Sequence, residues 1–94
     1  MNSVKELWEE LEKENPGRKE FYRVSGTISD VLSSLVVARV KKGWTLKDLA
    51  KKVHLSPRKI DKIERGDSSL SLDVLAKMLF HLGLSIQVIN EEKF

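Results

Sequence analysis

Residues 43–66 read GWTLKDLAKKVHLSPRKIDKIERG and contain two short helical patterns that follow each other closely. Apolar residues recur at the three- and four-residue spacing of a helix, as Leu46, Leu49, Ala50 and Val53 and then as Ile60 and Ile63. Only His54 and Leu55 separate the first pattern from the cap of the second. So short a link forces the two helices to cross steeply, with the small Ala50 where they meet.

Capping residues indicate where both helices begin. Thr45 and Asp48 have the spacing of a capping box, in which each side chain bonds the backbone N–H of the other residue. Ser56 is a preferred N-cap residue, and Pro57 suits the first position of the helix that follows it. We expect His54 to be the turn residue, because histidine is among the non-glycine types that adopt positive φ. Together these features predict a helix-turn-helix motif.

The second helix carries Arg58, Lys59 and Lys62 on its outer face. The major groove of B-DNA admits one α-helix, and an arginine there can bond a guanine through two donors. We therefore expect Arg58 and Lys62, four residues apart, to point into the groove. Lys59 would reach either a base or a phosphate. Ordinary surface charge is the alternative interpretation of all three side chains.

Phosphate contacts are expected around the same motif. Thr45, Lys47 and Ser56 lie at predicted helix N-termini, where backbone N–H groups favour an anion, although plain capping explains the two hydroxyls equally well. Nearby cations, including Lys41, would neutralise further phosphates. The complete set of residues predicted to contact DNA is Arg39, Lys42, Thr45, Lys47, Ser56, Pro57, Arg58, Lys59, Lys62 and Arg65.

Charge is distributed unevenly along the chain, although the formal net charge is only +3. Residues 39–66 contain ten Lys or Arg and three Asp or Glu, whereas residues 1–15 contain two Lys and five Glu. A basic block beside an acidic end favours two different partners, nucleic acid for the block and a basic protein for the end. The alternative is that both charge runs are solvated helix faces.

The composition argues against several classes of protein. The 94-residue chain has no cysteine for a disulfide or a thiolate metal site, and its two histidines lack the neighbouring carboxylates of a zinc site. No apolar run reaches the length of a membrane span, and the acidic N-terminus is unlike a signal peptide. No nucleophile–base set or glycine-rich phosphate loop is present. We therefore expect a cytoplasmic protein that is not an enzyme and uses no cofactor, small-molecule substrate or membrane.

Further helices are predicted on both sides of the motif, over residues 4–14, 18–23, 27–42 and 71–82. Ser25 and Gly26 are expected to end the second of these, and a capping box of Thr27 and Asp30 to begin the third. The last helix is expected to face the core with Leu72, Leu75, Ala76 and Leu79.

Leu84, Ile86 and Val88 alternate with polar residues, which predicts one short strand after the last helix. A lone strand leaves its backbone groups unpaired, and the sequence offers no second strand. We therefore infer that these three residues pair with the same strand of another copy in a symmetric homodimer. The chain would then comprise an N-terminal extension over residues 1–26, a DNA-binding domain over 27–83, and a strand and tail over 84–94.

Residues 35–84 resemble the Cro/C1-type (XRE) helix-turn-helix family of phage repressors and bacterial regulators. The matching positions are Ala38-Arg39, Gly43, Thr45, Leu49-Ala50, Ser56, Ile60, Ile63-Glu64, Gly66, Ser71-Leu72, Leu75 and Leu82-Gly83. The resemblance implies an all-α, lambda-repressor-like bundle of about five helices with an N-terminal extension helix and a short C-terminal β-strand used for dimerisation. It also implies a sequence-specific repressor that binds double-stranded DNA. The chain departs from the family at Leu46 and Pro57, where many members carry glutamines that contact a phosphate and an adenine edge.

The flanking segments resemble HigA-type antitoxins of toxin–antitoxin modules. The shared features are an N-terminal helix ending near a proline, a Lys-Glu-Phe-Tyr segment, a long helix running into Ala38-Arg39 and a final strand. This resemblance implies a dimer that represses its own operon and neutralises a RelE/HigB-like ribonuclease toxin, a basic protein. The residues that would bind the toxin are Leu7, Trp8, Leu11, Phe21 and Tyr22.

Two alternatives stay open. The apolar residues of the N-terminal segment are also consistent with packing against the chain's own long helix. The protein would then be a stand-alone regulator of the same family. An interaction domain that keeps the fold and has lost DNA readout is compatible with Leu46 and Pro57.

Overall fold

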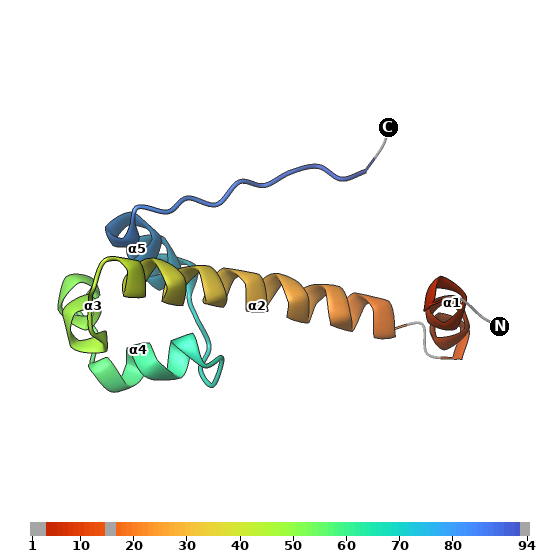
Figure 1. Ribbon diagram of the computed structural model, residues 1–94, viewed down its shortest axis with the longest axis horizontal. Coiled ribbons are helices and arrows are strands. Elements are labelled where there is room, and N and C mark those ends of the chain that lie inside the picture. Colours follow the sequence, from red (N-terminus) through yellow and green to blue (C-terminus); the bar gives the residue numbers. More distant parts are fainter. Residues whose placement is uncertain (1–3, 15–16, 93–94) are drawn as a thin grey trace. The chain divides into compact units, whose positions relative to one another are not determined.

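The computed structural model describes residues 4–14 and 17–92 of the chain (Figure 1). Its helices are α1 (Val4–Glu14), α2 (Arg18–Lys41), α3 (Leu46–Val53), α4 (Pro57–Glu64) and α5 (Leu72–Leu82). Two compact units divide the chain at residue 31, so that α3, α4, α5 and the end of α2 belong to the second unit, Leu32–Phe94. No helix in the described part is long and apolar enough to cross a membrane.

Helix α2 runs without interruption from Arg18 to Lys41, so the predicted break at Ser25 and Gly26 is wrong. Thr27 does not cap a new helix; its hydroxyl donates to the backbone carbonyl of Arg23, four residues earlier, at 3.0 Å. A glycine in a helix interior costs only about 1 kcal/mol relative to alanine. Ending the helix would instead leave several backbone donors and acceptors without partners. The predicted domain boundary after residue 26 therefore falls inside a helix.

The core of the second unit draws on all four of its helices. Its fully buried residues are Leu35, Leu49, Ala50, Val53, Ile60, Ile63, Met78 and Leu82, none more than 3% exposed. Helix α3 packs against both α4 and α5, as expected for the central element of this bundle (Figure 1). The inward faces predicted for α3 and α4 are confirmed, with Leu46 partly buried against the same cluster.

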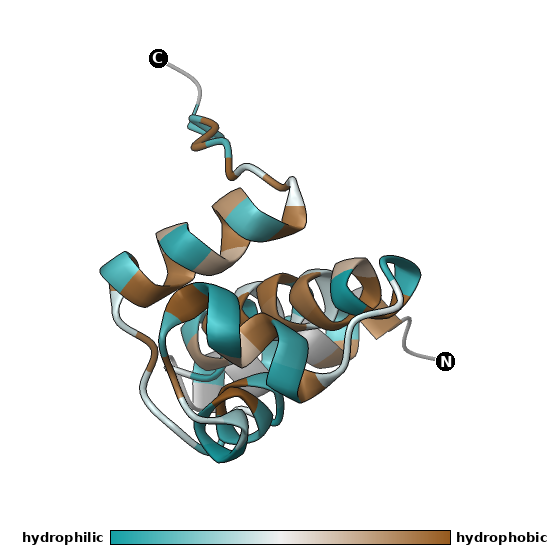
Figure 2. Ribbon diagram, turned by 90° about the vertical axis from the view of Figure 1, so that its left-hand side faces the viewer, coloured by the Kyte–Doolittle hydropathy of each residue, from teal (hydrophilic) through white to brown (hydrophobic). Residues whose placement is uncertain are grey.

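The inward face predicted for α5 is partly wrong. Leu75 and Leu79 pack against the core, but Leu72 is 82% exposed and Ala76 is exposed as well. Met78 and Leu82 are buried in their place. Helix α5 has apolar residues on most of its circumference, which Figure 2 shows as brown segments along it. Periodicity alone therefore does not identify which face of this helix is buried.

The turn between α3 and α4 has the conformation that the sequence predicts. His54 lies in the left-handed region, with φ 58° and ψ 43°, and its backbone N–H donates to the carbonyl of Ala50. The N–H of Leu55 donates to the same carbonyl at 3.0 Å. Ser56 then caps α4 by accepting from the backbone N–H of Lys59 at 3.1 Å. The chain thus reverses over three residues, which fixes the crossing of the two helices.

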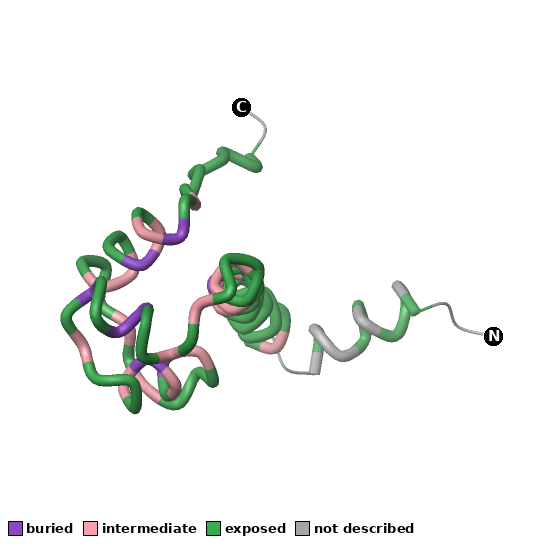
Figure 3. The backbone as a smooth tube through the Cα atoms, turned by 60° about the vertical axis from the view of Figure 1, so that its left-hand side comes forward, coloured by how far each residue is buried: buried purple, intermediate pink, exposed green. Residues whose placement is uncertain are grey.

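The predicted C-terminal strand is wrong for the described residues, which contain no strand. Gly83 ends α5 with φ 73°, and Leu84 packs partly buried against the core. Beyond it the tail is extended and exposed, as the green segment in Figure 3 shows, with Ile86 at 49% and Val88 at 98%. A strand needs a ladder partner, and the part of the chain seen here offers none. The second unit therefore holds four helices, with α1 as the extension helix, rather than a five-helix bundle with a strand.

Replacing His54 with isoleucine is expected to lower the free energy of unfolding by about 1–2 kcal/mol, because a β-branched side chain is strained in the left-handed region. His54→Gly should cause no such loss, since glycine adopts positive φ freely. Urea denaturation measures both variants. Lys51→Ile is the control, because it places the same side chain at an exposed helical position. Equal losses in His54→Ile and Lys51→Ile would contradict the role of the turn.

Candidate nucleic-acid interface

Helix α4 is held in one rotational position by its buried side. Ile60 and Ile63 are at most 1% exposed and lie in the core. Because successive side chains of a helix lie about 100° apart, this leaves Arg58 and Lys62 on the solvent side, one turn from each other. Both are exposed, and no interaction holds either side chain within the described part of the chain. Two free cations therefore project from the helix that the sequence predicts to enter the groove.

Lys59 has a partner that the sequence does not reveal. Its ammonium donates to the hydroxyl of Ser68 at 2.5 Å, and the residue is half-buried. Ser68 lies in the loop between α4 and α5, so Lys59 ties this loop back to α4. The side chain would have to give up this bond before it could reach a base or a phosphate.

Arg39 is turned into the protein and joins three elements. Its Nε bonds Glu64 Oε2 at 2.7 Å, its Nη2 bonds Glu64 Oε1 at 3.0 Å, and its Nη1 donates to the carbonyl of Trp44 at 2.8 Å. The two charged side chains are only 14% and 7% exposed. The hydrogen bond to Glu64 raises the pKa of Arg39 above its ordinary value. The guanidinium predicted to contact a phosphate is thus already engaged, and it braces α4 against α2.

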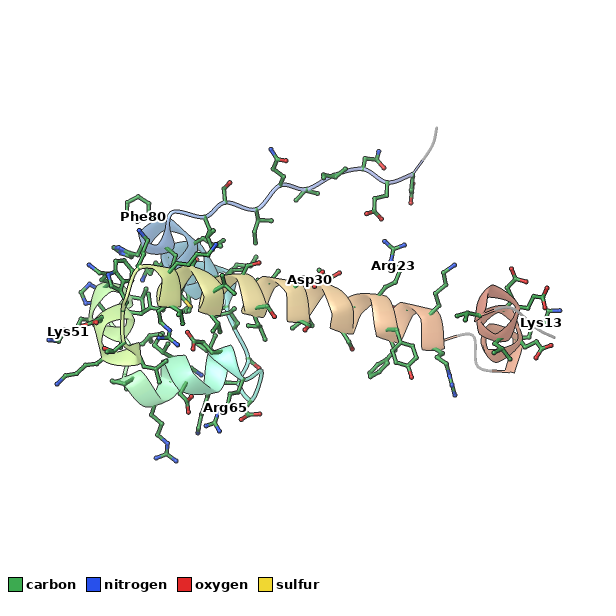
Figure 4. The ribbon with its side chains drawn as sticks, viewed as in Figure 1. Lys13, Arg23, Asp30, Lys51, Arg65 and Phe80 are labelled. Carbon is green, nitrogen blue, oxygen red and sulfur yellow. The ribbon has the colours of Figure 1, made fainter. Side chains whose placement is uncertain are left out.

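Asp61, the acidic residue on the outer side of α4, pairs with Arg65 four residues later. Arg65 Nη2 lies 2.6 Å from Asp61 Oδ2, and Arg65 Nε lies 3.8 Å from Asp67 Oδ2. The Asp61 and Arg65 side chains are 39% and 62% exposed, so their pairing is worth a few tenths of a kcal/mol at most. Arg65 extends from the end of α4 in Figure 4. Approaching phosphates can therefore compete for Arg65 at little cost.

The capping box at the start of α3 is confirmed. The N–H of Thr45 donates to Asp48 Oδ2 at 2.8 Å, and the N–H of Asp48 donates to the Thr45 hydroxyl at 3.1 Å. The first of these bonds is the main reason that the pKa of the Asp48 carboxyl lies below its ordinary value. A carboxylate thus occupies the helix N-terminus where Thr45 was predicted to meet a phosphate. Lys47 is exposed beside it and is the cation best placed to attract one.

Two lysine ammonium groups lie over the ring of Trp44, an arrangement that the sequence does not reveal. Lys42 Nζ and Lys52 Nζ lie 5.2 Å and 4.7 Å from the centre of its ring, which is cation–π distance. The ring is half-buried and packs against the core. Lys51 points away from α3 (Figure 4) and lines an open hollow with Trp44, Asp48 and Lys52. The position of Trp44 within the basic run of residues 39–66 was the available signal.

Three residues of the set predicted to bind a toxin have described side chains, and all three are exposed. Leu7, Phe21 and Tyr22 are 48%, 64% and 49% exposed. The Phe21 and Tyr22 rings contact each other edge to face, with centroids 5.5 Å apart. The side chains of Trp8 and Leu11 lie outside the described residues. The described members of this set therefore lie at the surface of the chain.

Removing the carboxylate of Glu64 tests the brace. We expect Glu64→Ala to lower the free energy of unfolding by about 1–3 kcal/mol, because it leaves the Arg39 guanidinium largely buried without its partner. Asp61→Ala removes an exposed carboxylate from the same helix and should cost less than about 0.5 kcal/mol. Urea denaturation compares the two variants. If they were equally stable, the Arg39–Glu64 pair would not be what holds α4 in place.

A comparison with protein-family models matches residues 37–89 to a family described as helix-turn-helix. The match includes α3, α4 and α5 and covers more than half of the chain. Comparisons with curated proteins and with solved structures return no match. The left-handed turn at His54, between two helices with capped N-termini, agrees with this assignment. The chain therefore belongs to the helix-turn-helix family, is of the Cro/C1 (XRE) type, and is a DNA-binding transcriptional regulator.

Proposed function

We propose that this protein is a sequence-specific repressor that inserts α4 into the major groove of its operator. One observation carries the proposal. Arg58 and Lys62 are exposed and unengaged within the described part of the chain, while Ile60 and Ile63 fix the opposite side of the same helix in the core. A cationic helix held rigidly at the surface of a small domain has the form required for groove binding.

Base readout in this proposal depends mainly on Arg58. Pro57, at the first position of α4, has no backbone N–H and no polar side chain, so it can only pack against the DNA. Leu46 is partly buried and apolar, so it cannot bond a phosphate through its side chain. Arg58 can bond a guanine through two donors, a contact worth about 1–3 kcal/mol of discrimination. Lys62, Lys47 and Arg65 would then serve mainly as phosphate contacts.

We propose further that the repressor works as a homodimer. Helix-turn-helix regulators commonly read two half-sites about one DNA turn apart, which requires two recognition helices. Several large apolar side chains are exposed on the isolated chain, among them Phe80 at 78% and Leu72 at 82% on α5. Exposed apolar surface of this kind is typical of a contact with another protein or another copy.

Binding to a toxin is a second candidate function, which the exposed Leu7, Phe21 and Tyr22 favour. Leu7 belongs to the acid-rich N-terminal segment, residues 1–15, and acidic side chains speed the association of a basic partner. In this proposal the protein is the antitoxin of a toxin–antitoxin module and represses its own operon. The stand-alone regulator remains the alternative.

Arg58→Ala is expected to weaken binding to the DNA upstream of the gene by about 10- to 100-fold while leaving binding to a scrambled fragment nearly unchanged, because it removes base readout. Lys62→Ala should weaken binding to both fragments and reduce the slope of log K against log salt by about 0.9. Fluorescence anisotropy at several salt concentrations measures both effects. Lys77→Ala, an exposed lysine of α5, is the matched control. Equal affinities of Arg58→Ala and Lys77→Ala for the upstream DNA would contradict the proposal that α4 reads the operator.

The antitoxin proposal is tested with the protein encoded by the neighbouring gene. We expect a small basic ribonuclease-like chain, and we expect the wild-type protein to bind it and inhibit its RNA cleavage. Leu7→Asp with Tyr22→Ala should weaken this binding at least tenfold, because both changes remove exposed apolar contacts. Val37→Ala, an exposed residue of α2 outside the predicted set, should not. If the protein encoded by the neighbouring gene neither bound this protein nor cleaved RNA, the antitoxin proposal would be wrong and the stand-alone regulator would be favoured.

A further inference from the structure

The N-terminal half of α2 carries an apolar stripe that its own chain leaves largely uncovered. The stripe consists of Phe21, Val24, Ile28 and Val31, and we call these four residues the α2 seam. The first three are 64%, 52% and 53% exposed, and Val31 is half-buried. Single exposed apolar residues are ordinary on protein surfaces, but a continuous row along one helix face marks a contact.

The spacing within the α2 seam is that of two helices packed side by side. Its residues are separated by three, four and three positions, which is the a/d pattern of a heptad repeat. The same alternation continues to Leu35, which is fully buried, and to Ala38, which packs against the core. The same apolar pattern is therefore buried in the core at Leu35 and Ala38 but exposed to solvent over most of the α2 seam. Val24, Ile28 and Val31 are β-branched, as is common at such positions.

We propose that a second copy of this chain covers the α2 seam, so that the N-terminal halves of two α2 helices pack against each other. This inference rests on the proposed dimeric DNA binding and names the surface that joins the two copies. Residues 18–31 contain three basic and two acidic residues, so two identical segments meet with little net repulsion. Ser25 and Thr27, which flank the seam, are small and uncharged and permit close approach. A strongly basic partner would find no acidic surplus on this part of α2.

The length of the α2 seam sets the strength of the contact. It spans only about two heptads, whereas a self-sufficient coiled coil needs at least three or four. We therefore expect weak, concentration-dependent self-association, which two half-sites on one DNA molecule strengthen by raising the effective concentration. The contact between the two α2 helices would thus form mainly when both copies are bound to the operator.

The experiment compares matched charge insertions on one helix. Val24→Glu with Ile28→Glu buries two carboxylates in the seam, whereas Val37→Glu introduces the same residue on another face of α2, at a valine that is 49% exposed. Sedimentation velocity over a range of concentrations should show at least tenfold weaker self-association for the double variant and none of this loss for Val37→Glu. Circular dichroism verifies that the helix content is retained. Phe80→Glu tests the exposed face of α5 in the same way.

Because the chain contains no cysteine, crosslinking offers an independent measurement. Val24→Cys should form a disulfide-linked dimer if the two helices run parallel in register, and a mixture of Val24→Cys and Ile28→Cys should crosslink if they run antiparallel. Val37→Cys should form neither product. The antiparallel case follows from the layers of such a pair, in which an a position faces a d position of the other helix.

Each outcome decides the matter. Loss of self-association in the seam variant, with crosslinking through residues 24 or 28, supports the proposal. A wild-type protein that stays monomeric at all concentrations, a dimer lost only in Phe80→Glu, or a seam variant impaired only in toxin binding overturns it. Self-association is measured without DNA, so its failure is distinguishable from a failure of Arg58 to read the operator.

Discussion

The contact of α3 with α4 is the constraint on which the site depends. The left-handed turn at His54 allows the chain to reverse, and Ile60 and Ile63 then seat α4 against Leu49 and Ala50 in the core. A shift of α4 by one residue would rotate its side chains by about 100° and bury charged side chains in place of the two isoleucines. Packing and burial thus select which side chains face the solvent. Arg58 faces the solvent because Ile60 and Ile63 hold the other side of α4 in the core.

Some cationic side chains of this protein bind partners within the fold, and others are exposed to solvent and able to bind DNA. Residues 39–66 are strongly basic in sequence, yet the Arg39 guanidinium is bound by Glu64 and the Lys59 ammonium by Ser68. A charge count cannot separate these uses, because the partners are determined by the fold; Arg39 and Glu64 lie 25 positions apart. The electrostatic surface offered to DNA is therefore smaller than the sequence suggests, and it is concentrated on the free faces of α3 and α4.

Local chemistry was predictable from the sequence, and long-range pairing was not. The caps at Thr45 and Ser56 and the turn at His54 depend on bonds between residues a few positions apart, which the sequence shows directly. The predicted break at Ser25 and Gly26 was wrong because the low helix propensity of two residues is outweighed by the regular helix on both sides of them. The C-terminal strand failed because a strand depends on a partner. For α5, with apolar residues on several sides, only the neighbouring helices decide which face is buried.

Weak self-association and a small set of DNA contacts would reinforce each other in this protein. A single unit offers few free cations, so its affinity for one half-site would be modest and would fall steeply as salt rises. When two units are joined, the second half-site is bound at the effective concentration set by the link, and the two binding free energies nearly add. Because the link is itself weak, occupancy of the operator would rise more steeply than the protein concentration.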